Sequence, residues 1–165
     1  DFSLSRGLGD VYKRQSLGMT QAIFLASGNT IEEALSFAAS LIGNILIGQK
    51  ELPASDRVDV FCDDIQDANK LDNILWEKPK FAIISHQLVT ENTEGIVRIG
   101  YPGTKFGLEA DCLINISPDL PRDLDTYQFY YQLVIMDGDK LRERAAETWA
   151  QCKKLGLDTT FFESL

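Results

Sequence analysis

Residues 58–84, VDVFCDDIQDANKLDNILWEKPKFAII, contain two short apolar segments with an amphipathic segment between them. The first apolar segment, 58–62, carries valine and phenylalanine and predicts a strand. Apolar residues then recur at three- and four-residue steps over 65–76, which predicts a helix with one buried face. Pro79 prevents this helix from continuing, so 81–84 is expected to extend as another strand. Strands that alternate with helices are typical of a parallel sheet covered by helices.

The segment before it shows the same alternation. Residues 21–26 predict a strand, and Thr30 and Glu33 have the spacing of a capping box, which begins a helix. Together with 58–62 this segment predicts a βαβ unit with a right-handed crossover. The apolar face of its helix is expected to pack on the sheet through Ile31, Ala34, Leu35, Ala38, Leu41, Ile42 and Ile45.

The second half of the chain continues the pattern. Residues 96–99 and 112–116 predict two more short strands. Residues 127–136 have a β-rich composition, although a helix is also compatible with them. Residues 139–155 predict a long final helix, and Gly156 stands where a left-handed residue would end it. These elements predict a single three-layer α/β/α domain with a largely parallel sheet, in a Rossmann-like arrangement.

The domain is expected to comprise residues 19–165. Residues 1–18 lack apolar periodicity and resemble a translated sequencing-adapter read, so they are interpreted as a non-native or disordered extension. Met19 is the expected natural start. The pair Gly7 and Gly9 is therefore not interpreted as a phosphate-binding loop.

Composition narrows the class of protein. The chain has 165 residues, 44% of them hydrophobic, which is enough for one core without disulfides or metals. Three scattered cysteines without a Cys-x-x-Cys pair are typical of free thiols in a reducing cytoplasm. A net charge of −9 repels phosphate backbones, so contact with DNA is expected only through partners. No apolar run reaches the roughly 18 to 20 residues of a membrane span, so no membrane association is expected.

Residues 71–86 carry an ordered motif of Leu-Asp, Leu-Trp, Pro, an apolar strand and the only histidine. This order resembles the chi subunit of the bacterial DNA polymerase III clamp-loader complex. The resemblance extends over about residues 21–160. Its other features are the acidic strand end at 60–64, the late strand at 111–115, and a final helix with Arg142, Trp149, Lys153 and Gly156.

The resemblance implies a non-catalytic accessory subunit without a cofactor. Such a subunit forms a heterodimer with a small partner, psi, and joins it to the C-terminal tail of the single-stranded-DNA-binding protein. That tail is acidic and ends in a phenylalanine carboxylate. Its receptor needs a cationic group for the carboxylate, an apolar pocket for the ring and flanking positive charge.

The final helix has two neighbouring stripes at 100° per residue. Leu141, Ala145, Thr148, Cys152 and Leu155 form one side, and Arg142, Ala146, Trp149 and Lys153 form a partly exposed shoulder. The resemblance implies that Arg142, Trp149 and Lys153 on this shoulder bind the tail. Ala146 stands where the family usually has an arginine, so the carboxylate site is expected either to be weaker here or to be completed by Arg144 or Lys153. The alternative is a solvated helix face on which the tryptophan packs.

The psi interface is implied at Trp76, Pro79 and Ile83, with Ser85 in place of a usual proline. A large rigid ring is a suitable interface anchor, and a core tryptophan at a helix end is the alternative. His86 is interpreted as a hydrogen-bonded residue at the end of a strand, without a catalytic role.

Two further groups of residues have structural interpretations. Asp63, Asp64 and Asp67 are interpreted as helix-capping residues and not as metal ligands. The aromatic run at 127–131 lacks interleaved basic residues, so strand packing is favoured over stacking with nucleic-acid bases.

Two rival functions remain. One is a small nucleotide-binding or hydrolytic α/β enzyme, although the chain contains no G-x-G-x-x-G, P-loop or G-x-S-x-G motif. The other is a chi-like adaptor of a repair helicase.

Overall fold

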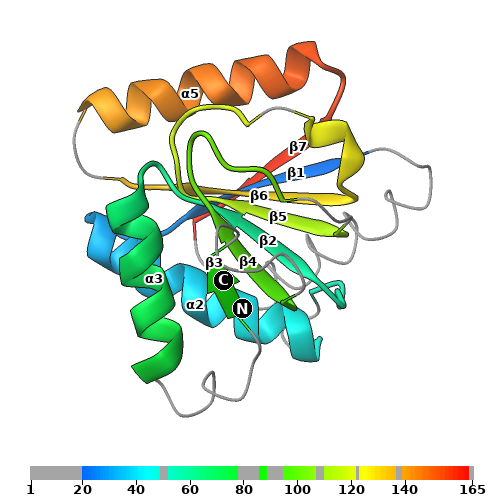
Figure 1. Ribbon diagram of the computed structural model, residues 1–165. Helices are drawn as coiled ribbons and strands as arrows, with labels where there is room; N and C mark the ends of the chain where they lie inside the picture. Colours follow the sequence, from blue (N-terminus) through cyan, green and yellow to red (C-terminus); the bar gives the residue numbers. More distant parts are fainter. Residues whose placement is uncertain are drawn as a thin grey trace.

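Seven parallel strands form one sheet in the computed structural model, which describes residues 20–48, 52–77, 86–88, 95–106, 110–121, 123–136 and 139–163 (Figure 1). The strand order is β3-β4-β2-β5-β6-β1-β7, and every recorded pair of neighbours is parallel. The predicted α/β class with a parallel sheet is therefore confirmed. The elements are β1 (Gln21–Ala26), α2 (Ile31–Ile47), β2 (Val58–Phe61), α3 (Ile65–Glu77), β3 (His86–Leu88), β4 (Val97–Gly100), β5 (Cys112–Asn115), a 3₁₀ turn η1 (Leu124–Thr126), β6 (Phe129–Val134), α5 (Asp139–Lys154) and β7 (Asp158–Phe162).

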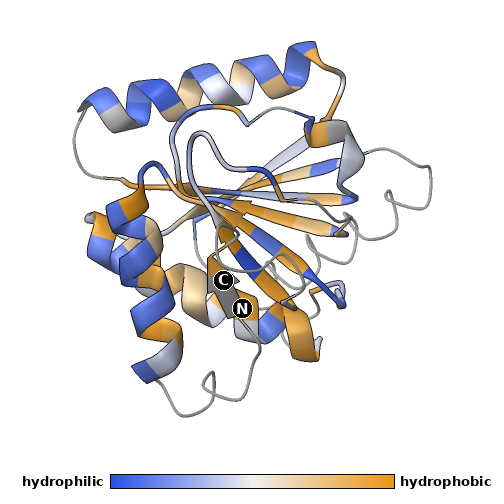
Figure 2. Ribbon diagram, in the orientation of Figure 1, coloured by the Kyte–Doolittle hydropathy of each residue, from blue (hydrophilic) through white to orange (hydrophobic). Residues whose placement is uncertain are grey.

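The helices form a layer on each side of the sheet. Figure 1 shows α2 and α3 below the strands and α5 above them. The larger core lies between the sheet and the α2–α3 layer, and the smaller core lies on the α5 side. In Figure 2 the strands are mainly hydrophobic, whereas most of α5 is hydrophilic. The smaller core includes Ala22, Phe24, Leu113, Tyr130, Val134, Ala145 and Cys152.

Local capping signals begin and end the helices as the sequence predicts. The Thr30 hydroxyl accepts a hydrogen bond from the Glu33 amide at 3.1 Å, and the Asp64 carboxylate accepts one from the Asp67 amide at 2.8 Å. At the end of α5, Gly156 adopts φ 79°, and the amides of Gly156 and Leu157 donate to the carbonyls of Lys153 and Cys152. This pair of bonds is a Schellman motif.

Four parts of the sequence interpretation need comment. Residues 129–134 are a strand, so the helical alternative for 127–136 is wrong. Leu155 is 63% exposed because it follows the last turn of α5, so it does not share the burial of Ala145, Thr148 and Cys152, with which the helical spacing groups it. The expected strand at 81–84 lies outside the described residues, and His86 is the first residue of β3. The sequence interpretation also missed β7, which adds an edge to the sheet beside β1.

A buried ion pair holds loops onto the part of the sheet beside α5. The Arg98 guanidinium lies 2.5 Å from the Asp59 carboxylate, with both side chains fully buried. Arg98 also donates to the Phe106 carbonyl at 2.8 Å, and the Tyr127 hydroxyl donates to Asp59 at 2.7 Å. Burial raises the pKa of Asp59 to about 6, although the Tyr127 hydroxyl and the Arg98 guanidinium lower it. The pair thus joins strands β2 and β4 to two loop segments of the α5 layer.

Candidate peptide-binding site

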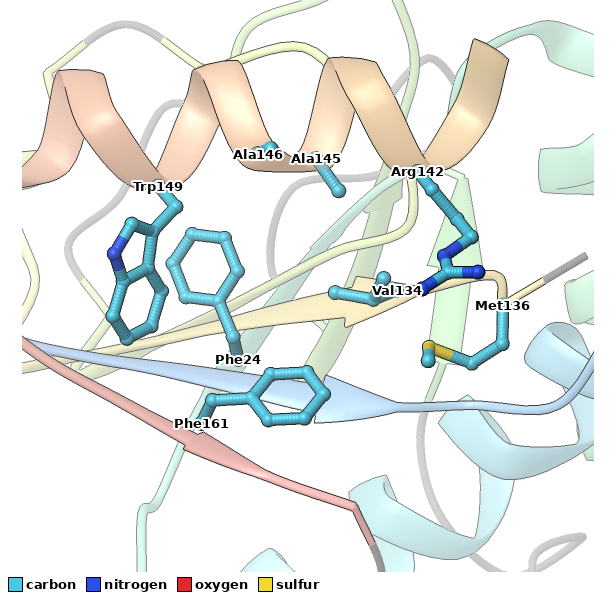
Figure 3. A pocket seen from close by; sticks show the side chains of 8 residues that line it. All are labelled: Phe24, Val134, Met136, Arg142, Ala145, Ala146, Trp149 and Phe161. Carbon is cyan, nitrogen blue, oxygen red and sulfur yellow. The ribbon is translucent and has the colours of Figure 1, made fainter. Parts of the chain in front are cut away.

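A pocket of about 280 Å³ lies between α5 and the sheet (Figure 3). Three strands or their continuations supply its sheet side, and α5 supplies the opposite side. Its volume is near the lower end of the roughly 300–1,000 Å³ typical of ligand pockets. The lining residues are Phe24, Val134, Met136, Arg142, Ala145, Ala146, Trp149 and Phe161.

Two simple periodicities bring these residues together. On α5, residues 142, 145, 146 and 149 follow three- and four-residue steps and therefore share one face. On the strands, Phe24 pairs in register with Phe161, so both side chains lie on the α5 side of the sheet. The two small residues Ala145 and Ala146 leave room beneath the helix.

Aromatic rings form one end of the pocket. The Trp149 and Phe24 rings meet edge to face, with centroids 5.0 Å apart and planes at 76°. Phe24 also meets Tyr130 edge to face at 6.3 Å in the smaller core. The Lys153 ammonium lies 5.2 Å from the centre of the Trp149 ring, which is a cation–π distance. Trp149 is thus held by both neighbours and remains only half-buried.

Arg142 supplies the charge at the other end of the pocket. It is the one charged side chain among the lining residues, and Figure 3 shows its guanidinium beside Val134 and Met136. Within the described part of the chain, no hydrogen bond or ion pair involves Arg142. A guanidinium can bind a carboxylate through two parallel hydrogen bonds.

Arg144 is not part of the pocket lining. Its guanidinium pairs with the Asp119 carboxylate at 2.6 and 3.3 Å, and this hydrogen bonding raises the pKa of Arg144. The structure therefore brings together Arg142 and Trp149 in the pocket and places Lys153 above the Trp149 ring. Arg144 instead pairs with Asp119 outside the pocket lining.

A loop at 117–119 seats α5 on the sheet. The Thr148 hydroxyl donates to the Pro118 carbonyl at 2.5 Å, next to the Arg144–Asp119 pair. From below, the Asn115 amide donates to the Asp119 carbonyl and the Gln132 amide donates to the Ser117 carbonyl, each at 2.8 Å. These buried polar groups fix the position of the helix that carries Arg142 and Trp149.

The predicted partner side lies in the other helical layer. Trp76 is 57% exposed in the last turn of α3, so its interpretation as a core tryptophan is wrong. Pro79 and Ile83 lie outside the described residues. Helix α3, which carries Trp76, lies on the side of the sheet opposite α5 and the pocket.

Sequence reasoning missed the sheet side of the pocket. Phe24, Val134, Met136 and Phe161 were not predicted as site residues. The continuous apolar run of 22–26 could have indicated a strand buried on both faces, which includes Phe24, and the β-rich sequence DTTFF after Gly156 could have indicated β7. No local signal shows that these strands are neighbours.

The carboxyl edge of the sheet, where parallel α/β enzymes bind ligands, is acidic here. Asp63 follows β2 and accepts a hydrogen bond from Ser117, which follows β5, at 2.9 Å. A second hollow at the start of α2 includes Glu32 and Glu33 among its lining residues. Negative charge at both places disfavours a bound phosphate. The described residues contain no group of three potential metal ligands.

The three cysteines are buried, and burial raises the pKa of Cys152 to about 11. Each therefore remains a protonated thiol at neutral pH, unlike an activated nucleophile. The described part of the chain also contains no helix long and apolar enough to cross a membrane.

Comparison with known protein families identifies a family that this chain matches. A sequence model of the family described as "DNA polymerase III chi subunit, HolC" matches residues 19–160, which is most of the chain. Trp76, Arg142 and Trp149 lie within the matched segment, and Phe161 lies one residue beyond it. No curated protein matches the sequence.

Proposed function

This chain belongs to the DNA polymerase III chi subunit family, and from this membership we propose that it is a non-catalytic adaptor between two proteins of bacterial replication. In this proposal the α5 pocket binds the C-terminal tail of the single-stranded-DNA-binding protein, and the Trp76 side binds psi. The adaptor works in the cytoplasm and contacts DNA through these partners.

The observation that supports tail binding is the combination of Arg142 with an apolar, aromatic pocket. A peptide that ends in phenylalanine presents a ring and a carboxylate at one residue. The ring fits beside Phe24 and Trp149, and the carboxylate fits the guanidinium at the other end. Burial of a phenyl side chain contributes about 1.5–3 kcal/mol, and a charged hydrogen bond contributes a similar amount.

Charge near the pocket suits the acidic part of the tail. Lys153 and Lys154 form the last turn of α5, although the whole chain carries a net charge of −9. A peptide that leaves the pocket past Trp149 reaches the Lys153 ammonium. Exposed charges of this kind are screened by salt, so tail affinity should fall moderately as ionic strength rises.

The Trp76 side and the α5 pocket lie on opposite sides of the sheet, which supports a role as an adaptor. Trp76 belongs to the α2–α3 layer, and the pocket lies under α5 across the sheet. Partners at these places would not compete for the same residues. An exposed tryptophan is also among the residue types that most often dominate interface energies.

The test is calorimetric titration of the full chain with an acidic peptide that ends in phenylalanine, with a free or an amidated C-terminus. We expect roughly micromolar affinity for the free carboxylate, and at least tenfold weaker binding for the amide or for Arg142→Glu. Lys70→Glu is the matched control, because it makes the same charge change on α3, in the other helical layer. Equal binding by the R142E and K70E variants would contradict the proposal.

A further inference from the structure

Phe161 is an exposed aromatic residue that the cores do not use. It is 41% exposed on β7, and among the described residues it belongs to neither hydrophobic cluster. Its neighbour Phe162 lies on the opposite side of the strand and packs against the larger core. Phe162 thus contributes to the larger core, whereas Phe161 contributes its ring to the lining of the pocket.

The sheet register places this ring opposite α5. Phe161 pairs with Phe24 on the neighbouring strand, and Phe24 in turn meets the Trp149 ring edge to face. Figure 3 shows Phe161 on the sheet side of the pocket, extending toward Met136, with Trp149 descending from the helix. The pocket is thus bordered by three aromatic rings and by a single cation, Arg142.

We propose that Phe161 is a specificity-determining residue, which makes the pocket select a peptide with an aromatic last residue over one with an aliphatic last residue. This inference rests on the proposed function of the pocket. Ala145 and Ala146 leave the space beneath the helix for the incoming ring, and Phe161 closes that space from the sheet.

The physical basis is the geometry of aromatic pairs. Leucine and phenylalanine side chains gain similar free energy from burial alone. A ring that meets other rings edge to face gains more, equivalent to roughly two- to tenfold in affinity. The lining contains one cation, so the carboxylate contact is the same for both peptides. A difference in affinity between the two peptides therefore comes from the aromatic residues of the pocket.

The test compares two acidic peptides that are identical except for a last residue of phenylalanine or leucine, titrated into the full chain and into Phe161→Leu and Phe161→Ala. The intact chain is expected to bind the phenylalanine peptide roughly tenfold more tightly. In F161L this preference should fall to about two- to threefold, because the Phe161 ring is lost while an apolar side chain and the Phe24 and Trp149 rings remain. In F161A both affinities should fall, with the larger loss for the phenylalanine peptide.

Leu155→Ala is the matched control, because it removes another exposed apolar side chain that does not line the pocket. Its peptide preference should equal that of the intact chain, and thermal melting of all variants should show that they fold. An unchanged preference in both F161L and F161A would overturn this inference alone. If the intact chain bound neither peptide, the proposed function would fail, and this inference with it.

Discussion

Replacing Arg98 by methionine should destabilise the protein strongly, because it leaves the Asp59 carboxylate buried without its cation. Both side chains are fully buried, and the guanidinium lies 2.5 Å from the carboxylate. Removal of one partner from a buried ion pair typically costs about 3–5 kcal/mol. That is a large part of the roughly 5–15 kcal/mol by which a domain of this kind is stable.

The contacts of Arg98 account for this magnitude. The side chain donates to Asp59 at 2.7 Å through Nε, and to the Phe106 carbonyl at 2.8 Å through Nη1. Each buried group left without a partner costs about 1–3 kcal/mol, and more if it is charged. The Tyr127 hydroxyl would still donate to Asp59, so the carboxylate would keep one hydrogen bond.

Urea unfolding at neutral pH measures the effect. The matched control is Lys70→Met, because the Lys70 ammonium lies 3.8 Å from Glu32 in an exposed pair and should contribute less than about 1 kcal/mol. The double variant D59L/R98M should recover much of the loss, since neither charge is then left alone. A loss below about 1 kcal/mol for R98M, or a double variant whose losses simply add, would refute the reasoning.

Two other predictions concern the same pair and the pocket. The raised pKa of Asp59, about 6, means that the folded state holds this proton more tightly than the unfolded state, whose carboxyl has a pKa near 3.8. The stability that comes from this tighter proton binding is therefore fully present below about pH 4 and is lost as pH rises through about 6. Asp59→Asn removes the titrating group, so it should flatten this part of the pH profile of urea unfolding. Ala146→Arg should place a second guanidinium at the pocket and tighten binding of the phenylalanine-ended peptide several-fold at low salt, with a smaller gain at high salt. Equal affinities of A146R and the intact chain in calorimetry at low salt would count against the assigned carboxylate position.

Local chemistry determined much of the fold in advance. Two helices begin near Thr30 and Asp64 because the side-chain oxygens of these residues cap the first turn. Helix α5 ends just before Gly156 because glycine tolerates the left-handed conformation. The helical spacing of Arg142 and Trp149 likewise predicted that they share one face of α5. These features depend on residues within a few positions of each other, so the sequence alone contains them.

The tertiary structure decided the other half of the pocket. Phe24 and Phe161 come from opposite ends of the chain, and only the pairing of β1 with β7 makes them neighbours. An arginine in a strand gives no sign of burial by itself, yet Arg98 is buried because Asp59 lies on the adjacent strand. Strand order and cross-strand pairing depend on how much apolar surface the whole chain can bury together, which no local pattern encodes.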